Sequence, residues 1–123
     1  MRTLTIYQWN SLLERLNKRT ESDLQKWEED KEKDRFATFT ETFAVTVDSV
    51  DKDDYPPFRI QVWRRGDSGG VLDSLESEVD AEGGISAVDR KLGELYGMVA
   101  LKARGLEHLA DDLLAELDDP TED

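Results

Sequence analysis

The 123-residue sequence contains no cysteine, which excludes disulfide bonds, thiolate catalysis, zinc-thiolate sites and iron-sulfur clusters. It contains a single histidine, so a cluster of histidine ligands cannot form within one chain. No apolar run approaches the roughly 20 residues that span a bilayer, and the amino-terminal residues lack the continuous apolar stretch of a secretory signal. We therefore expect a cytoplasmic protein that makes no membrane contact.

Basic residues are also scarce: the chain has 16 lysines and arginines compared with 29 aspartates and glutamates, and its net charge is −13 at pH 7. A protein that binds duplex DNA needs lysines and arginines to neutralise phosphates, so this balance argues against direct nucleic-acid binding. Hydrophobic residues make up 37% of the chain, which is enough for one modest core. We expect one acidic domain over residues 1–123, with a disordered end at residues 119–123.

The first segment has the apolar spacing of a helix. Its apolar positions recur every three or four residues, at Trp9, Leu13, Leu16, Thr20, Leu24 and Trp27. Thr5 and Gln8 fit a capping box at its start. The pattern predicts one helix to about Lys33, although a second box-like pair, Ser22 and Gln25, leaves open two shorter helices that break near Thr20.

A period of two then replaces the helical spacing and predicts strands. Residues 36–47 read as one strand with a single buried face, formed by Ala37, Phe39, Phe43, Val45 and Val47. An acidic loop with two prolines separates it from a second strand over residues 58–63, which we expect to be antiparallel to the first. A Gly- and Ser-rich turn at residues 66–70 leads to a third, weaker strand over residues 71–79.

The last segment carries the longest apolar stripe, in which spacings of three and four persist over residues 88–117 behind the capping residue Ser86. It predicts one long or kinked helix that passes through Gly105 and ends before Pro120. Such a helix is about 44 Å long and overhangs a small domain, which favours a partner or a second copy. The fold class is thus α+β: an N-terminal helix, a small antiparallel sheet of two or three strands, and a long amphipathic C-terminal helix packed on the sheet.

The string from Gly66 to Gly70 resembles the nucleophile motif of the chymotrypsin-like serine proteases. In that family a histidine and an aspartate precede the serine in the chain, whereas the single histidine here, His108, follows Ser68. The string is typical of a turn between strands, because Gly, Asp and Ser tolerate turn conformations.

The loop before the second strand is rich in carboxylates, with Asp48, Asp51, Asp53 and Asp54 within seven residues. It does not fit an EF-hand, because Pro56 and Val62 occupy the positions of the required glycine and glutamate. A solvated loop, an anionic contact surface and a cation site remain open, and we favour no metal.

Trp63 precedes two arginines, Arg64 and Arg65, and lies on the polar side of the second predicted strand. Exposed tryptophan and arginine are enriched in binding hot spots, so Trp63 is a candidate partner-binding residue. The alternative is that the first helix covers the Trp63 indole.

The carboxy-terminal segment is the most acidic part of the chain. Its acids are Glu107, Asp111, Asp112, Glu116, Asp118, Asp119, Glu122 and Asp123. The six acids of residues 107–119 lie opposite the leucines on a helix, about one per 3.3 Å of axis, which is close to the roughly 3.4 Å between phosphates along a DNA strand. Such a surface can stand in for nucleic acid; the alternative is an acidic helix that only favours solubility.

We therefore expect a non-enzymatic binding protein, without a cofactor, that inhibits or shields a basic partner, most naturally a nucleic-acid-binding or nuclease protein. In size and charge, but in no motif, the chain resembles nucleic-acid mimics such as phage anti-restriction and anti-CRISPR inhibitors and the immunity proteins of nuclease toxins. The predicted partner-binding residues are Glu107, Asp111, Asp112, Glu116, Asp118, Asp119, Asp51, Asp53, Asp54 and Trp63.

Two other interpretations stay open. One is an acidic accessory or secretion-type chaperone that forms a homodimer through the C-terminal helix and holds a client segment on its sheet. The other is adaptation to high salt, in which the acidity of the surface serves hydration and no partner is involved.

Overall fold

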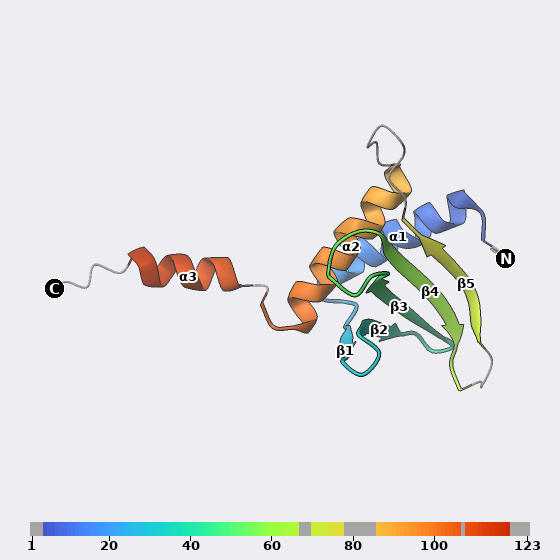
Figure 1. The fold of residues 1–123 in the computed structure, drawn as a ribbon, viewed down its shortest axis with the longest axis horizontal. Helices are drawn as coiled ribbons and strands as arrows, with labels where there is room; N and C mark the ends of the chain where they lie inside the picture. Colours follow the sequence, from blue (N-terminus) through green and yellow to red (C-terminus); the bar gives the residue numbers. More distant parts are fainter. Residues whose placement is uncertain (1–3, 67–69, 78–85, 107, 119–123) are drawn as a thin grey trace.

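The computed structural model describes residues 4–66, 70–77, 86–106 and 108–118. Within these ranges a five-stranded antiparallel sheet carries two helices on one face, and a third helix projects from the body (Figure 1). Each strand pairs with its neighbour in sequence, in the order β1-β2-β3-β4-β5. The α+β class is confirmed, and the sheet is larger than the predicted two or three strands.

Helix α1 spans Ile6–Glu21 and begins with the predicted capping box. The Thr5 hydroxyl accepts from the backbone N–H of Gln8 at 3.1 Å, and the Gln8 side chain accepts from the backbone N–H of Thr5 at 2.9 Å. The predicted extension to Lys33 is wrong, and so is the alternative of two helices, because residues 28–30 form the edge strand β1 (Glu28–Asp30).

Helix α1 ends at Glu21 in a Schellman motif, four residues before Gln25. Asp23 adopts the left-handed conformation, with φ 61°, and the N–H of Leu24 donates to the carbonyl of Arg19 at 2.8 Å. Beyond this turn Trp27 points back to the helix, and its indole N–H donates to the hydroxyl of Thr20 at 2.9 Å. Trp27 therefore keeps the helical spacing of the core stripe although it is not helical.

Residues 36–47, predicted as one strand, form a hairpin of β2 (Arg35–Phe39) and β3 (Phe43–Ser49). The Thr40 side chain closes the turn, since its hydroxyl accepts from the N–H of Phe43 at 3.0 Å. Because the chain reverses here, the predicted common face is wrong: Val45 and Val47 are buried, whereas β2 buries Phe36 and Thr38 and turns Ala37 and Phe39 to the other face.

The remaining strands agree with the prediction. β4 (Phe58–Arg64) is antiparallel to β3 and buries Ile60, and β5 (Val71–Glu76) is the third strand of the prediction. Residues 65–70 connect β4 to β5, and residues 67–69 and 78–79 lie outside the described part of the chain. A bulge between Val62 and Trp63 interrupts the register with β5.

The predicted long helix is two helices, α2 (Ala87–Ala103) and α3 (Leu109–Asp118). Ser86 caps α2 as predicted, accepting from the N–H of Asp89 at 3.1 Å. A second Schellman motif ends α2: Gly105 has φ 71°, and the N–H of Leu106 donates to the carbonyl of Leu101 at 2.8 Å. In the sequence the spacing of the apolar residues continues unchanged across this break, but the chain changes direction there.

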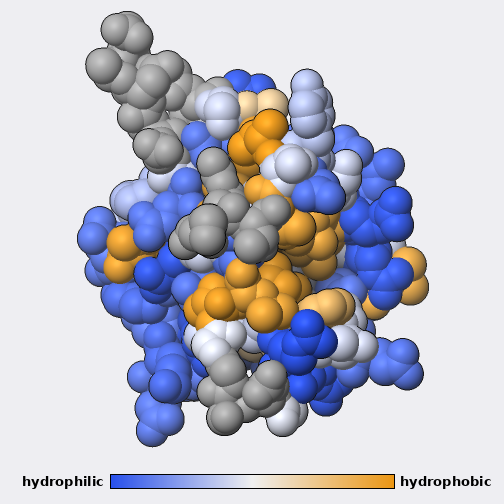
Figure 2. All heavy atoms as spheres, turned by 90° about the vertical axis from the view of Figure 1, so that its right-hand side faces the viewer, coloured by the Kyte–Doolittle hydropathy of each residue, from blue (hydrophilic) through white to orange (hydrophobic). Residues whose placement is uncertain are grey.

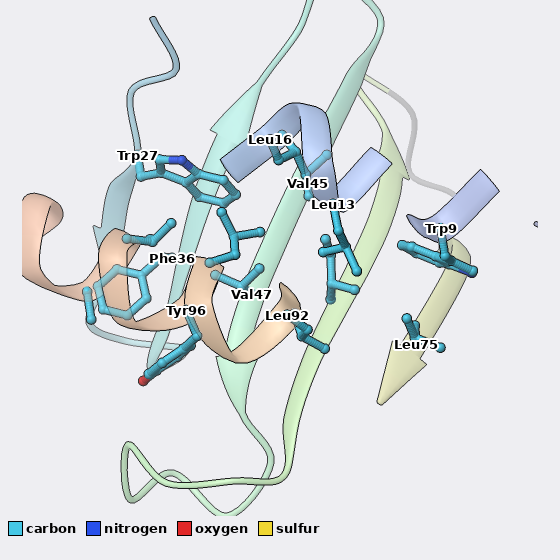
Figure 3. Close-up of a cluster of buried hydrophobic side chains, with 14 of the residues drawn as sticks. Trp9, Leu13, Leu16, Trp27, Phe36, Val45, Val47, Leu75, Leu92 and Tyr96 are labelled. Carbon is cyan, nitrogen blue, oxygen red and sulfur yellow. The ribbon is translucent and has the colours of Figure 1, made fainter. Parts of the chain in front are cut away.

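One core lies between the two helices and the sheet (Figure 3). α1 contributes Trp9 and Leu13 and α2 contributes Leu92, all three fully buried against the sheet. At one end the ring of Tyr96 stacks on Phe58, with centroids 4.5 Å apart, and meets the edge of Phe36. The domain therefore closes without α3.

Candidate functional site

Helix α3 is the main candidate for a functional surface, because it projects from the body and buries none of its side chains (Figure 1). Its leucines are exposed, with Leu113 at 51% and Leu117 at 71%. The acids Asp111, Asp112 and Glu116 are exposed as well. A helix that stabilises a fold buries its apolar stripe, so this one is free to contact something else.

The side chains of α3 are arranged as an apolar stripe with a carboxylate row on each flank. At 100° per residue, Leu109, Leu113, Leu114 and Leu117 fall within a sector of about 140°. Asp112 and Glu116 border one side of this sector, and Asp111 and Asp118 border the other. The predicted site residues Glu107 and Asp119 lie outside the described residues.

The end of α2 is held in place by its C-cap residue, Arg104. Its guanidinium lies 3.2 Å from an Asp54 oxygen, 3.4 Å from a Glu29 oxygen and 5.1 Å from the centroid of the Phe36 ring. These contacts tie the end of α2 to β1, β2 and the β3–β4 loop. From this fixed point Gly105 turns the chain outward.

The loop carboxylates Asp53 and Asp54 serve the fold. Asp54 accepts a hydrogen bond of 2.5 Å from the Tyr96 hydroxyl, and this bond, together with Arg104, holds the pKa of Asp54 below its usual value. Burial and the same contact raise the pKa of Tyr96. Asp53 accepts from the Ser49 hydroxyl at 2.9 Å and from the N–H of Tyr55 at 3.0 Å.

The structure does not gather these loop acids with the acids of α3 into one surface. Asp51 is exposed, but the contacts of Asp53 and Asp54 run to β3, α2 and their own loop. The described residues bring no three metal-ligating side chains together in a way that could hold an ion. Of the predicted anionic contact residues that the structure describes, only those of α3 lie together on one exposed element.

A buried carboxylate that sequence reasoning left out as a site residue, Asp48, lies on the outer face of the sheet. It is 4% exposed and accepts from Arg59 at 2.6 Å and from Lys52 at 2.7 Å. The same contact raises the pKa of Arg59. Two cations neutralise this acid, so it adds no anionic surface.

Trp63 lies on the face of the sheet opposite the helices, so the prediction that the first helix covers it is wrong. Its indole N–H donates to the Thr46 hydroxyl at 2.9 Å, and the guanidinium of Arg35 lies 5.3 Å from the ring centroid. It lines a groove of about 560 Å³. Acids of β1 form one side of this groove, and Arg64 and Arg65 stand at the other.

A second hollow, of about 360 Å³, was missed by sequence reasoning, because it is assembled from separate elements. Its apolar lining is Leu4, Leu12, Phe43, Val45, Val62 and Leu72. Figure 2 shows hydrophobic side chains gathered on this side of the molecule, the right-hand side of Figure 1. The sequence gives no direct signal for it, because the placement of Phe43 depends on the turn at Thr40 and Leu72 comes from a separate strand.

In the described ranges no helix combines the length and the apolar character needed to cross a bilayer. Comparison with known proteins gives no further constraint: no family model matches the chain, and no curated protein and no solved structure matches it either.

Proposed function

We propose that this protein is a non-enzymatic binding protein that presents α3 to a basic protein and thereby inhibits or shields a nucleic-acid-binding surface on it. One observation carries the proposal: α3 joins exposed leucines to carboxylates on both flanks, holds no basic residue, and is not used by the fold. An apolar groove with lysine and arginine on its rims is the surface that fits this pattern, in the helix-in-groove mode of recognition.

The helix also needs a partner for its own stability. An isolated helix shorter than about 12 residues is marginal in water, and α3 has 10. Asp111 and Asp112 in the first turn favour the helix dipole, but Asp118 at the last turn opposes it and no basic residue is there to compensate. A cationic partner near Glu116 and Asp118 supplies the missing charge, so binding and helix formation support each other.

The spacing of the charges supports nucleic-acid mimicry. From Asp111 to Asp118 the axis rises about 10.5 Å, so the four carboxylates on the two flanks of the helix are on average about 3.5 Å apart along it, in unequal steps. Phosphates along one DNA strand are about 3.4 Å apart. An anti-defence inhibitor, an anti-CRISPR protein or an immunity protein against a nuclease would use such a surface, and we place the chain in this class as a proposal.

A chaperone-like role is the second candidate, and the groove beside Trp63 favours it. The floor of that groove is a sheet face with an aromatic ring and small side chains, Ala37 and Ala44, between the acids of β1 and two arginines. An extended client segment of mixed charge fits there. This activity would depend on the Trp63 groove and would not require the carboxylates of α3.

The test is capture of partners from the native host by the immobilised full chain, at roughly 0.1 M and 0.5 M salt. Mimicry predicts a basic nucleic-acid enzyme that is captured at low salt, is released at high salt and by DNA, and loses activity when bound. Neutralising Asp111, Asp112, Glu116 and Asp118 to their amides abolishes capture in this case.

The matched control neutralises four exposed acids elsewhere, Glu21, Glu32, Glu41 and Asp51, and so has the same net charge. This control keeps the capture if α3 is the binding surface. Equal losses in both variants would reduce the effect to net charge, and salt-resistant capture that depends on Trp63 would favour the chaperone.

A further inference from the structure

We infer that the apolar pocket beside the start of α1 receives helix α3 of a second copy of this chain, so that the protein associates head to tail. The inference concerns a surface that the proposed function does not use. It makes self-association a competitor for α3, because a helix seated in another copy cannot bind a basic partner.

The pocket has the chemistry that the leucine stripe needs. Its lining is apolar except for Thr40 and Asp73, and the Asp73 carboxylate is turned inward, where it accepts from the N–H of Leu4 at 2.7 Å. Phe43 and Leu72 at its edge are 38% and 39% exposed. Its volume of about 360 Å³ lies within the range of sites that bury small ligands, and is suited to a few leucine side chains.

The charges of the two surfaces are complementary. Arg64, which also borders the Trp63 groove, stands opposite Phe43 in the β3–β4 register, and its guanidinium lies 5.8 Å from the centroid of this pocket-lining ring. Among the described residues no carboxylate pairs with Arg64, in a chain of net charge −13. The carboxylates that flank the leucine stripe of α3 likewise pair with no cation in the part of the chain that the structure describes. Seating the stripe in the pocket brings a carboxylate row next to Arg64.

The positions of the two surfaces make the contact intermolecular. Figure 1 places α3 at one end of the molecule, and the pocket lies at the other, beside the amino terminus of α1 and β5. An α3 helix that points away from the body cannot fill its own pocket. Two different surfaces that meet in this way form a heterologous contact, which extends into chains or closes into a ring.

Salt distinguishes this contact from the proposed function. Copies of net charge −13 repel each other, and the contact is mainly apolar, so screening strengthens self-association. Binding of a basic partner weakens under the same change. The two uses of α3 therefore respond to salt in opposite directions.

The experiment is sedimentation velocity of the full chain over a concentration series at roughly 0.1 M and 0.5 M salt. We expect concentration-dependent association that increases with salt. Leu113→Ser with Leu117→Ser removes the stripe, and Leu72→Glu places a charge at the pocket edge; each variant alone stays monomeric. Since all three positions are exposed, circular dichroism should show that both variants fold.

Mixing the two variants is the decisive measurement. One retains only a pocket and the other retains only an α3 stripe, so the mixture forms a one-to-one complex that cannot grow. Arg64→Ala weakens the association about twofold to fivefold, whereas Arg90→Ala, exposed on α2, leaves it unchanged.

Three outcomes would overturn the inference: a wild-type chain that is monomeric at every concentration and salt, a Leu72→Glu variant that associates like the wild type, or a mixture that forms no complex. The second would indicate an α3–α3 contact. If self-association fails but low-salt capture of a basic protein persists, the proposed function stands without this inference.

Discussion

The hydroxyl of Tyr96 donates a hydrogen bond of 2.5 Å to the carboxylate of Asp54, across 42 positions of sequence. It joins the β3–β4 loop to the middle of α2, and Arg104 binds the same carboxylate from the end of α2. Two donors from one helix therefore hold the loop in place. An acid that looks like part of a contact surface in the sequence is a structural anchor.

Asp54→Asn should lower the free energy of unfolding by about 1 kcal/mol at neutral pH, because a charged acceptor for two donors becomes neutral. The folded-state pKa of Asp54 lies below its unfolded value of about 3.9, so its stabilisation is complete above that pH and is lost as the pH falls through the folded-state pKa. Urea unfolding of both proteins should show a gap that closes in acid. Asp51→Asn, in the same loop, should show no such gap.

Substitution by alanine at Gly97, within α2, and at Gly105, just after its C-cap, should change the stability of the protein in opposite directions. Gly105→Ala puts a side chain at φ 71° and should cost about 1 kcal/mol, although no atom lies within 4 Å of the added carbon. Gly97→Ala, within the helix and also free of contacts, should stabilise the protein by about 0.5 kcal/mol. Thermal unfolding checks both; equal effects would contradict the assigned conformation of Gly105.

Leucines of α2 and α3 should differ in what they contribute to stability. Leu92→Ala removes a fully buried side chain and should cost about 2–5 kcal/mol. Leu113→Ala removes an exposed one and should change the stability by less than about 0.5 kcal/mol. The measurement is urea unfolding of dilute protein, followed by tryptophan fluorescence. A large loss for Leu113→Ala would mean that α3 packs on the body.

Trp63 should account for the fluorescence that a neutral quencher can reach. Trp9 and Trp27 are 0% and 8% exposed, whereas Trp63 is only partly buried, on the open face of the sheet. Acrylamide should quench one component of the wild-type emission, and Trp63→Phe should remove that component. If the variant remains as quenchable as the wild type, the indole of Trp63 is not in the groove.

The misplaced helix ends show where local pattern is insufficient. Trp27 continues the apolar spacing of α1, and Leu106 continues that of α2, yet each follows a residue in the left-handed conformation, Asp23 or Gly105. The sequence signals the break at Gly105, because a glycine interrupts the helical pattern there. Asp23 gave a weak signal, because an aspartate adopts this conformation only where the surrounding contacts favour it.

Local signals in the sequence were sufficient to predict the capping box at Thr5, the cap at Ser86, the alternation of β4 and the separation of leucines from acids on α3. Which of the patterned residues are buried follows from the packing of the elements, because burial depends on what another element covers. Val99 and Leu113 lie on one stripe in the sequence, but the first packs in the core and the second is exposed. The turn at Gly105 separates them, since α3 beyond it projects away from the sheet.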